Sequence, residues 1–134
     1  MHITPTSKGY IAGQVSFRFN TAPDADGLGG QWTNCARFAR QGGVSISSLW
    51  ASSAAADMQV ELLQGVLPVR HLLVIEKEGI FKRLCEDGFH LRMGCVMVTG
   101  CGYPDISTRA CVSRLATLFP VCHYTLLVAL IVSC

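Results

Sequence analysis

The chain has 134 residues, which is enough for one domain with a modest hydrophobic core. Half of the residues are hydrophobic and 15% are charged, a composition that excludes an intrinsically disordered chain. The formal net charge of +2 is too small to indicate nucleic-acid binding through bulk electrostatics. Any contact with DNA must therefore come from particular residues.

Seven cysteines occur in the chain, but none of them forms a C-x-x-C pair, the close ligand spacing typical of structural zinc sites. Their number is odd, and several stand at apolar positions of periodic segments, where cysteine behaves as a small hydrophobe. This pattern indicates free thiols in a reducing compartment rather than a disulfide framework.

Neither end of the chain predicts a membrane or export segment. The N-terminal MHITPTSKGY lacks a basic stretch followed by an apolar one, so we expect no signal peptide. The C-terminal YTLLVALIVSC is apolar but shorter than the ~20 residues that span a bilayer. We therefore expect a buried strand there and no membrane partner.

The first part of the chain, residues 1–70, predicts a β-rich segment. In AGQVSFRFN, apolar and polar residues alternate with the period of a half-buried strand. The turn-rich TAPDADGLGG separates it from QWTNCARF, which predicts a second short strand in a hairpin with the first. Further on, ASSAAADMQVELLQGV favours a helix by propensity, although its apolar pattern is weak.

Residues 71–134 predict alternating strands and helices. HLLVIE is a continuous apolar run, typical of a parallel strand covered on both faces, and GCVMVT and YTLLVALIV predict two more strands. Apolar residues at helical spacing lie between them: Ile80, Phe81, Leu84 and Cys85, then Ile106, Ala110, Leu115 and Leu118. The order β-α-β-α-β predicts an α/β fold with a parallel sheet and right-handed crossovers.

The ends of these two helices are marked by residues with known positional preferences. Gly88 follows the first helix where it would stop, and Pro120 ends the second. Pro104 and Asp105 open the second helix, and an N-cap role for Asp105 is favoured over metal binding. We expect His90, after the first helix, to be a surface residue.

A charged residue and a glycine loop follow two neighbouring predicted strands. Glu76 ends HLLVIE, and Gly100-Cys101-Gly102 follows GCVMVT. Ligands of open α/β sheets bind beyond the carboxyl ends of the strands, so we expect both at one edge. A carboxylate there suits Mg²⁺, and glycines let backbone N–H groups approach a phosphate.

Simpler explanations exist for each of these residues. A carboxylate such as Glu76 also favours the dipole of a following helix, and a tight turn explains the glycines. Basic residues on the two helices suit DNA phosphates, yet each is equally explained by a solvated helix face. These residues are Lys77, Lys82 and Arg83 on the first helix and Arg109 and Arg114 on the second.

The segment LLVIEKEGIFKRLCEDGFHLRMGCVMVTGCGYPDISTRACVSRL resembles the Toprim domain found in the A-type chain of topoisomerase VI and in its eukaryotic relative, the meiotic double-strand-break transesterase. The family pattern is approximately VEK-x-x-x-F-x-R-L-x-x-x-x-F followed by TGKGYPD-x-x-TR. EDGFH with TGxGYPD is most similar to the meiotic branch, and SKGYIAGQVSFRF and NCARFARQGGVSISS also resemble the family's preceding segment. The matches are Glu76, Lys77, Phe81, Arg83, Leu84, Phe89, Thr99, Gly100, Gly102, Tyr103, Pro104, Asp105, Thr108 and Arg109.

The resemblance implies a Toprim-like, Rossmann-like fold and a role in cutting DNA. Members of the family act as dimers that break both strands by transesterification, with a tyrosine of a winged-helix domain as nucleophile and Mg²⁺ held by Toprim acids. It implies that Glu76 is a Mg²⁺ ligand and that Lys77, Gly100, Gly102 and Arg109 contact DNA. The implied partners are DNA and either a second copy or a B-type ATPase subunit, and the implied location is the nucleus.

Three departures from the family pattern predict a partial Toprim domain that is inactive alone. The nucleophilic tyrosine motif is not found, no Asp or Glu follows Asp105, and Cys101 replaces the lysine of TGKGYPD. The tail after Phe119 is atypical, as a misplaced splice or a frame change would make it. Two alternatives remain: a non-catalytic module for dimerisation or for binding a partner of the break machinery, and an unrelated α/β domain that binds a small phosphate ligand.

Overall fold

The computed structural model describes residues 9–20, 30–63, 65, 68–102 and 104–118, and the backbone of residues 124–126. The strands are β1 (Tyr10–Gly13), β2 (Val15–Phe19), β3 (Thr33–Asn34), β4 (Val44–Ser45), β5 (Met58–Leu62), β6 (His71–Ile75), β7 (Cys95–Thr99) and β8 (Tyr124–Leu126). The α-helices are α1 (Glu78–Glu86), α2 (Phe89–Met93) and α3 (Ile106–Ala116), and the 3₁₀ helices are η1 (Ala39–Gln41), η2 (Ser48–Ala51) and η3 (Ser53–Asp57).

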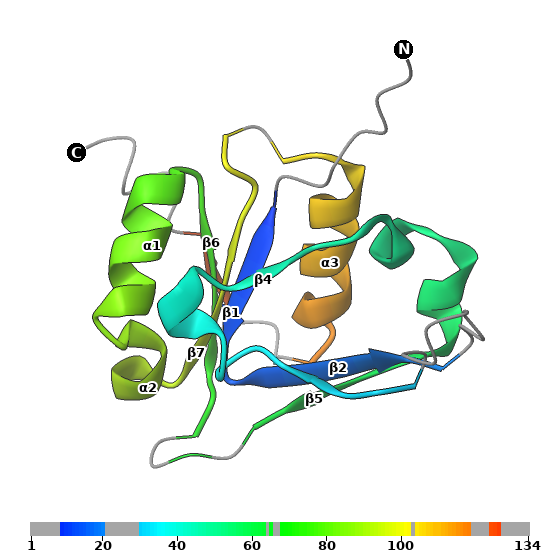
Figure 1. The fold of residues 1–134 in the computed structure, drawn as a ribbon, viewed down its shortest axis with the longest axis horizontal. Helices are drawn as coiled ribbons and strands as arrows, with labels where there is room; N and C mark the ends of the chain where they lie inside the picture. The colour runs from blue at the N-terminus through cyan, green and yellow to red at the C-terminus, as the bar shows by residue number, and fades with distance from the viewer. Residues whose placement is uncertain are drawn as a thin grey trace.

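A five-stranded sheet with the order β4-β1-β7-β6-β8 forms the centre of the molecule. β6 is parallel to both β7 and β8, whereas β1 is antiparallel to β7 and β4. Helices α1 and α2 cover one face and α3 covers the other (Figure 1). The predicted β-α-β-α-β order, with parallel strands in an α/β fold, is confirmed.

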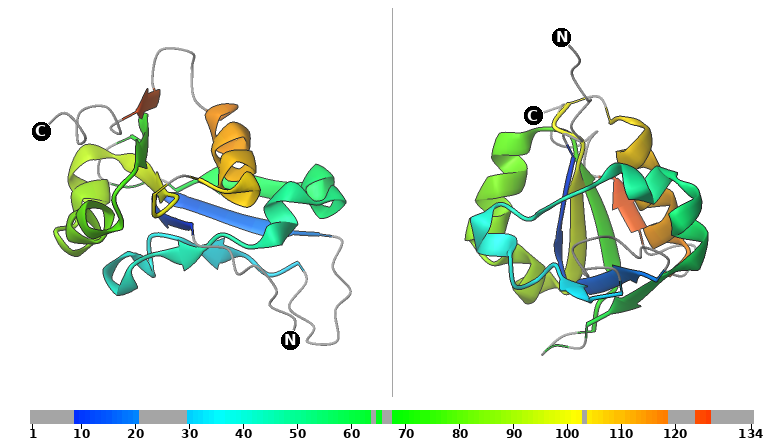
Figure 2. Two further views of the ribbon diagram at one scale, coloured as in Figure 1. Left: turned by 90° about the horizontal axis from the view of Figure 1, so that it is seen from above. Right: turned by 45° about the vertical axis from the view of Figure 1, so that its right-hand side comes forward.

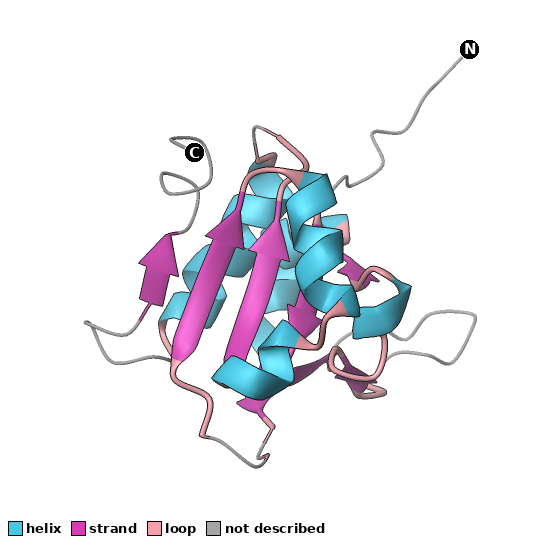
Figure 3. Ribbon diagram, turned by 90° about the vertical axis from the view of Figure 1, so that its left-hand side faces the viewer, coloured by secondary structure: helices cyan, strands magenta, loops and turns pink. Residues whose placement is uncertain are grey.

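The third predicted strand is present in part. β8 lies at the edge of the sheet beside β6 (Figure 3), and its backbone pairs from Leu72↔Tyr124 to Val74↔Leu126. Pro120 and the rest of YTLLVALIV lie outside the described residues. None of the helices in the described ranges combines the length and the apolar character that a bilayer crossing needs.

The N-terminal part forms a second, three-stranded sheet with the order β3-β2-β5. The predicted hairpin between β2 and β3 is confirmed by the pairs Ser16↔Asn34 and Phe17↔Thr33. β1 and β2 are nearly continuous in sequence but belong to different sheets, and β2 runs across the end of the larger sheet (Figures 1 and 2). The chain turns at Gly13, where φ is 121° and a Cβ would lie 2.5 Å from the Cys95 carbonyl oxygen. Only glycine fits that turn.

The helix predicted for ASSAAADMQVELLQGV is wrong for most of its length. Its helical residues are Ala51, the last of η2, and Ser53–Asp57, both in 3₁₀ turns, and Met58–Leu62 is β5, paired with β2 from Val15↔Leu62 to Phe19↔Met58. Within MQVEL, exposed Gln59 and Glu61 alternate with less exposed apolar residues. Tertiary pairing with β2 outweighs the helical propensity of the neighbouring alanines.

The predicted apolar face of α3 is wrong at its first residue. Ile106 is 66% exposed, whereas Thr108, Cys111 and Leu115 are buried against the sheet. The N-cap prediction for Asp105 is confirmed, because its Oδ1 accepts a hydrogen bond of 2.8 Å from the Thr108 backbone N–H. This cap places the start of the helix and leaves Ile106 on the outer side.

The described cysteines are free, as the sequence predicts, and four of them are buried: Cys35, Cys85, Cys95 and Cys111. Burial raises the pKa of Cys35 and of Cys95 to about 12 and that of Cys85 to about 11. Thiols with such pKa values stay protonated near neutral pH, so these residues act as core hydrophobes.

The prediction that His90 is a surface residue is wrong. Its side chain is 3% exposed, because α2 packs on β1 and β7 between Gly88 and Gly94, which both have positive φ. Its Nδ1 has no hydrogen-bond partner among the described residues, and burial lowers the pKa of the imidazole below its usual value. A neutral ring is therefore the form that the fold favours.

We expect stability to fall as the pH drops below about 6.5, because the unfolded chain then binds a proton that buried His90 does not. His90→Gln should flatten this slope. Urea unfolding at about pH 7.5 and about pH 5.5 measures it. Arg92→Gln, an exposed change in the same helix, is the control and should keep the wild-type slope. An unchanged slope in His90→Gln would contradict the assignment.

Asp105→Ala should lower the free energy of unfolding by about 1 kcal/mol, because the Thr108 N–H loses its acceptor. Asp105→Asn keeps an amide oxygen at the same place and should stay within about 0.5 kcal/mol of the wild type. Urea unfolding compares the two variants. Equal losses in both would show that the carboxylate charge, and not the cap, stabilises the helix.

Candidate functional site

The carboxyl ends of β6 and β7 lie side by side. Ile75 pairs with Thr99 in parallel register, so Glu76 and Gly100 leave the sheet at the same edge. The Gly102 backbone N–H then donates a hydrogen bond of 2.9 Å to the Glu76 carbonyl oxygen. The expectation that Glu76 and the glycine loop share one edge is thus met.

The glycine loop from Gly100 to Gly102 is held by hydrogen bonds to the ends of β6 and β7. A Cβ on Gly100 would lie 2.7 Å from the Pro104 Cα, and Gly102 has a φ of 111°. Cys101 itself has a positive φ of 54°, and its N–H donates to the Thr99 Oγ1 at 3.1 Å. The tight turn therefore accounts for both glycines, and the N–H groups of Cys101 and Gly102 already donate to Thr99 and Glu76, at the ends of the two strands.

An open hollow of about 420 Å³ lies at this edge, lined by Glu76, Lys77, Glu78, Cys101 and Gly102. Two carboxylates and one ammonium group thus share the same space. Glu76 is half-buried, whereas Lys77 is exposed in the extended residue before α1. The site combines a metal-ligating charge with a cation that suits a phosphate.

Glu78 is a site residue that the sequence pattern did not single out. Its Oε2 accepts a hydrogen bond of 2.9 Å from the Lys82 Nζ, one turn along α1, and this contact lowers the pKa of the Glu78 carboxyl. Lys82 in turn lies 6.0 Å from the centroid of the Tyr10 ring. The sequence did contain a signal that could have identified Glu78, because it is a second acidic residue two positions after Glu76.

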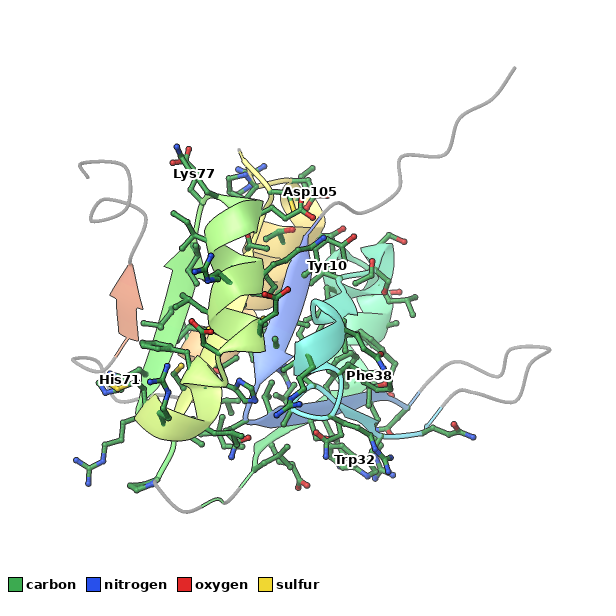
Figure 4. The ribbon with its side chains drawn as sticks, turned by 60° about the vertical axis from the view of Figure 1, so that its left-hand side comes forward. Tyr10, Trp32, Phe38, His71, Lys77 and Asp105 are labelled. Atoms are coloured by element: carbon green, nitrogen blue, oxygen red, sulfur yellow. The ribbon has the colours of Figure 1, made fainter. Side chains whose placement is uncertain are left out.

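The other predicted site residues, Gly100 and Arg109, do not line the hollow. Gly100 is buried behind the loop, and Arg109 is exposed on α3 and does not line the hollow. Asp105 lies at the same edge as Lys77 (Figure 4), but its Oδ1 caps α3. The structure thus brings together Glu76, Lys77 and Gly102.

The described residues fit a divalent metal only in part. No group of three or more His, Cys, Asp or Glu side chains suited to a metal occurs in the part of the chain that the structure describes. Glu76 and Glu78 offer two carboxylates, and Mg²⁺ is commonly held by one or two carboxylates together with waters and substrate phosphates. The site suits a metal whose other ligands come from outside these residues.

Comparison with known proteins identifies the family. Residues 71–128 match the family model that describes the Toprim domain of Spo11 and of the topoisomerase 6 A-type chain. The chain is 33% identical over 128 residues to the meiotic recombination protein SPO11 of Mus musculus, covering 94% of this chain and 27% of that protein. It is 29% identical over 129 residues to SPO11 of Homo sapiens, with 94% and 27% covered.

A topoisomerase is also similar: the A3 chain of DNA topoisomerase 6 from Oryza sativa subsp. indica is 28% identical over 116 residues, which are 86% of this chain and 22% of that protein. The chain spans about a quarter of the length of the curated relatives it matches. The matched region begins at the first residue of β6 and includes α1, β7 and α3, which carry the strand ends, the hollow and the glycine loop. Through residues 71–128, the chain belongs to the Toprim domain family shared by Spo11 and the A-type chain of topoisomerase 6.

Proposed function

We propose that this chain provides the Toprim part of a protein that makes DNA double-strand breaks in meiotic recombination, by Mg²⁺-dependent transesterification in the nucleus. The observation that carries the proposal is the placement of Glu76 beside the glycine loop by the Ile75↔Thr99 pair and the Gly102 N–H bond. The similarity to meiotic recombination proteins supports the choice of reaction.

Each residue of the site has a proposed role. Glu76 is a Mg²⁺ ligand, and Glu78, which lines the same hollow, is a candidate for a second carboxylate ligand. Lys77 and Arg109, both exposed, contact DNA phosphates. Gly100 and Gly102 contribute by their small size, since the loop N–H groups of Cys101 and Gly102 are occupied. Bound Mg²⁺ would offset the negative charge on the reacting phosphate.

The chain needs partners to complete this reaction. No Asp or Glu follows Asp105 in the sequence, and Tyr10 is half-buried within β1 rather than exposed at the hollow. The partners we propose are DNA and either a second copy of the chain or a B-type ATPase subunit. Further ligands for the metal would come from the DNA phosphate and from water.

A second candidate function is a non-catalytic module for dimerisation or for binding a protein of the break machinery. It is favoured by Leu91 and Met93, which are exposed on α2 on the outer surface of the molecule. The two functions differ in their need for a metal, because an interaction module has no use for the carboxylate of Glu76.

Titration with Mg²⁺, or with Mn²⁺ followed by its paramagnetic signal, should show saturable binding to the wild-type chain. Glu76→Gln removes the ligand charge and should weaken binding by at least about tenfold, since even outer-shell changes weaken metal sites that much. Glu61→Gln, an exposed change on β5, is the matched control and should bind as the wild type does. If Glu76→Gln binds the metal as tightly as the wild type, the Glu76 carboxylate is not a ligand and serves only to stabilise the dipole of α1. If neither protein binds the metal, the result favours the interaction module.

The purified 134-residue chain should leave supercoiled plasmid intact in the presence of Mg²⁺. The physical reason is that the described residues lining the hollow include two carboxylates and no tyrosine. Agarose electrophoresis after protease treatment detects strand breaks, and omission of protease detects protein bound to 5′ ends. Linear plasmid with covalently attached chain would overturn this expectation.

A further inference from the structure

A second hollow lies at the opposite end of the molecule from Lys77. It has a volume of about 440 Å³ and is formed by the segment around β3, the turn before η1, and the start of β4. Figure 4 shows Trp32 and Phe38 there, far from Lys77 and Asp105. We name it the Trp32–Phe38 pocket, lined by Trp32, Thr33, Asn34, Arg37, Phe38, Gly43 and Val44.

Exposed aromatic rings mark this pocket. Trp32 is 41% exposed and Phe38 is 38% exposed, and both belong to its lining. Large aromatic side chains that remain exposed beside a hollow are typical anchors of protein interfaces, where tryptophan and arginine are enriched. Burial of these rings would give a partner a sizeable apolar contact.

The described residues at the Trp32–Phe38 pocket carry positive charge. Arg37 lines it, and the described lining residues include no carboxylate. The guanidinium carbon of Arg18 lies 4.8 Å from the centroid of the Trp32 ring, and its Nε donates a hydrogen bond of 2.6 Å to the Gln59 Oε1. Two guanidinium groups beside exposed rings favour an anionic partner.

Hydrogen bonds hold the backbone that forms the wall of the pocket. The Asn34 Oδ1 accepts hydrogen bonds from the backbone N–H groups of Ala36 at 2.9 Å and of Arg37 at 3.1 Å. The Gly43 N–H donates to the Phe38 carbonyl at 3.0 Å, and Gly43 has a φ of 90°, which closes the turn around η1. A partner would therefore meet a preformed surface and order little of it.

The position of the pocket separates it from the candidate catalytic edge. Nucleic acid bound at Lys77 would need a continuous row of cations to reach Trp32, and the pocket lining supplies only Arg37. An extended peptide needs only one apolar anchor and a few acidic side chains. We propose that the Trp32–Phe38 pocket binds an extended acidic segment of a partner protein, with an apolar side chain inserted between the two rings. This proposal shares no residue with the metal site.

The test is fluorescence polarisation with a labelled peptide of about twelve residues, in which Asp and Glu surround a central Leu-Phe pair. The wild-type chain should bind it saturably. Trp32→Ala and Arg37→Glu should each weaken binding by at least about tenfold, since such anchors dominate interfaces. Acrylamide quenching of tryptophan should decrease when the peptide covers Trp32.

Matched controls come from exposed residues elsewhere. Leu49→Ala removes a side chain that is 38% exposed, as Phe38 is, and Arg92→Glu reverses an exposed charge on α2. Both should bind the peptide as the wild type does, and circular dichroism verifies that all four variants are folded. A peptide with Lys in place of the acids should not bind.

Three results would overturn the proposal. The first is no saturable binding, or binding that Trp32→Ala and Arg37→Glu leave unchanged. The second is tighter binding of oligothymidylate than of the acidic peptide, which would assign the pocket to single-stranded DNA. The third is a dimer in light scattering that Trp32→Ala dissociates, which would assign it to a second copy of the chain. If the peptide does not bind, the outcome of the Glu76 metal titration is unaffected, because the two sites share no residue.

Discussion

The parallel pairing of β6 with β7 positions both the hydrophobic cores and the candidate site of this molecule. Its register runs from His71↔Cys95 to Ile75↔Thr99, and it brings two strand ends to one edge. Because side chains alternate along a strand, a shift by one residue would reverse which face each side chain covers. In the observed register, Leu72 and Val98 pack on the α3 side, and Ile75 and Met97 on the α1 side. The two cores and the site therefore depend on the same pairing.

The elements around this pairing were predictable because their sequences carry strong local signals. HLLVIE and GCVMVT are short, mostly apolar runs, a pattern typical of a strand covered on both faces. Asp105 was recognised as an N-cap from residue type and position alone. Signals of this kind act within a few residues and do not need the tertiary structure.

The errors arose where distant residues decide the structure. MQVEL becomes β5 because β2 offers it a partner about forty residues earlier in the chain, while the nearby alanines favour a helix. His90 is buried because Gly88 and Gly94 permit the turns that fold α2 onto β1 and β7. The lining of the Trp32–Phe38 pocket is local in sequence, but the turn around η1 that brings its two sides together has no apolar periodicity that would predict it.

The candidate metal site was predictable in outline but not in chemistry. The strand-end rule placed Glu76 beside the glycine loop, as the structure does. It did not reveal Glu78, nor that the N–H groups of Cys101 and Gly102 already donate to Thr99 and Glu76. Because those N–H groups are occupied, the proposed role of the glycines changes: they do not donate hydrogen bonds to the DNA, but their lack of a side chain lets the DNA approach the loop closely.

The charges at the hollow impose one further constraint on the proposed function. Glu76 and Glu78 would repel a DNA phosphate, and Lys77 at the hollow and Lys82 through its contact with Glu78 offset that charge without making the site strongly attractive. A divalent cation bound between the carboxylates and the phosphate would reverse the sign of this interaction, and the phosphate would in turn supply the oxygen ligands that the described residues lack. Metal and DNA would therefore each increase the affinity for the other by the same factor. An incomplete carboxylate set thus fits a site that forms only when both are present.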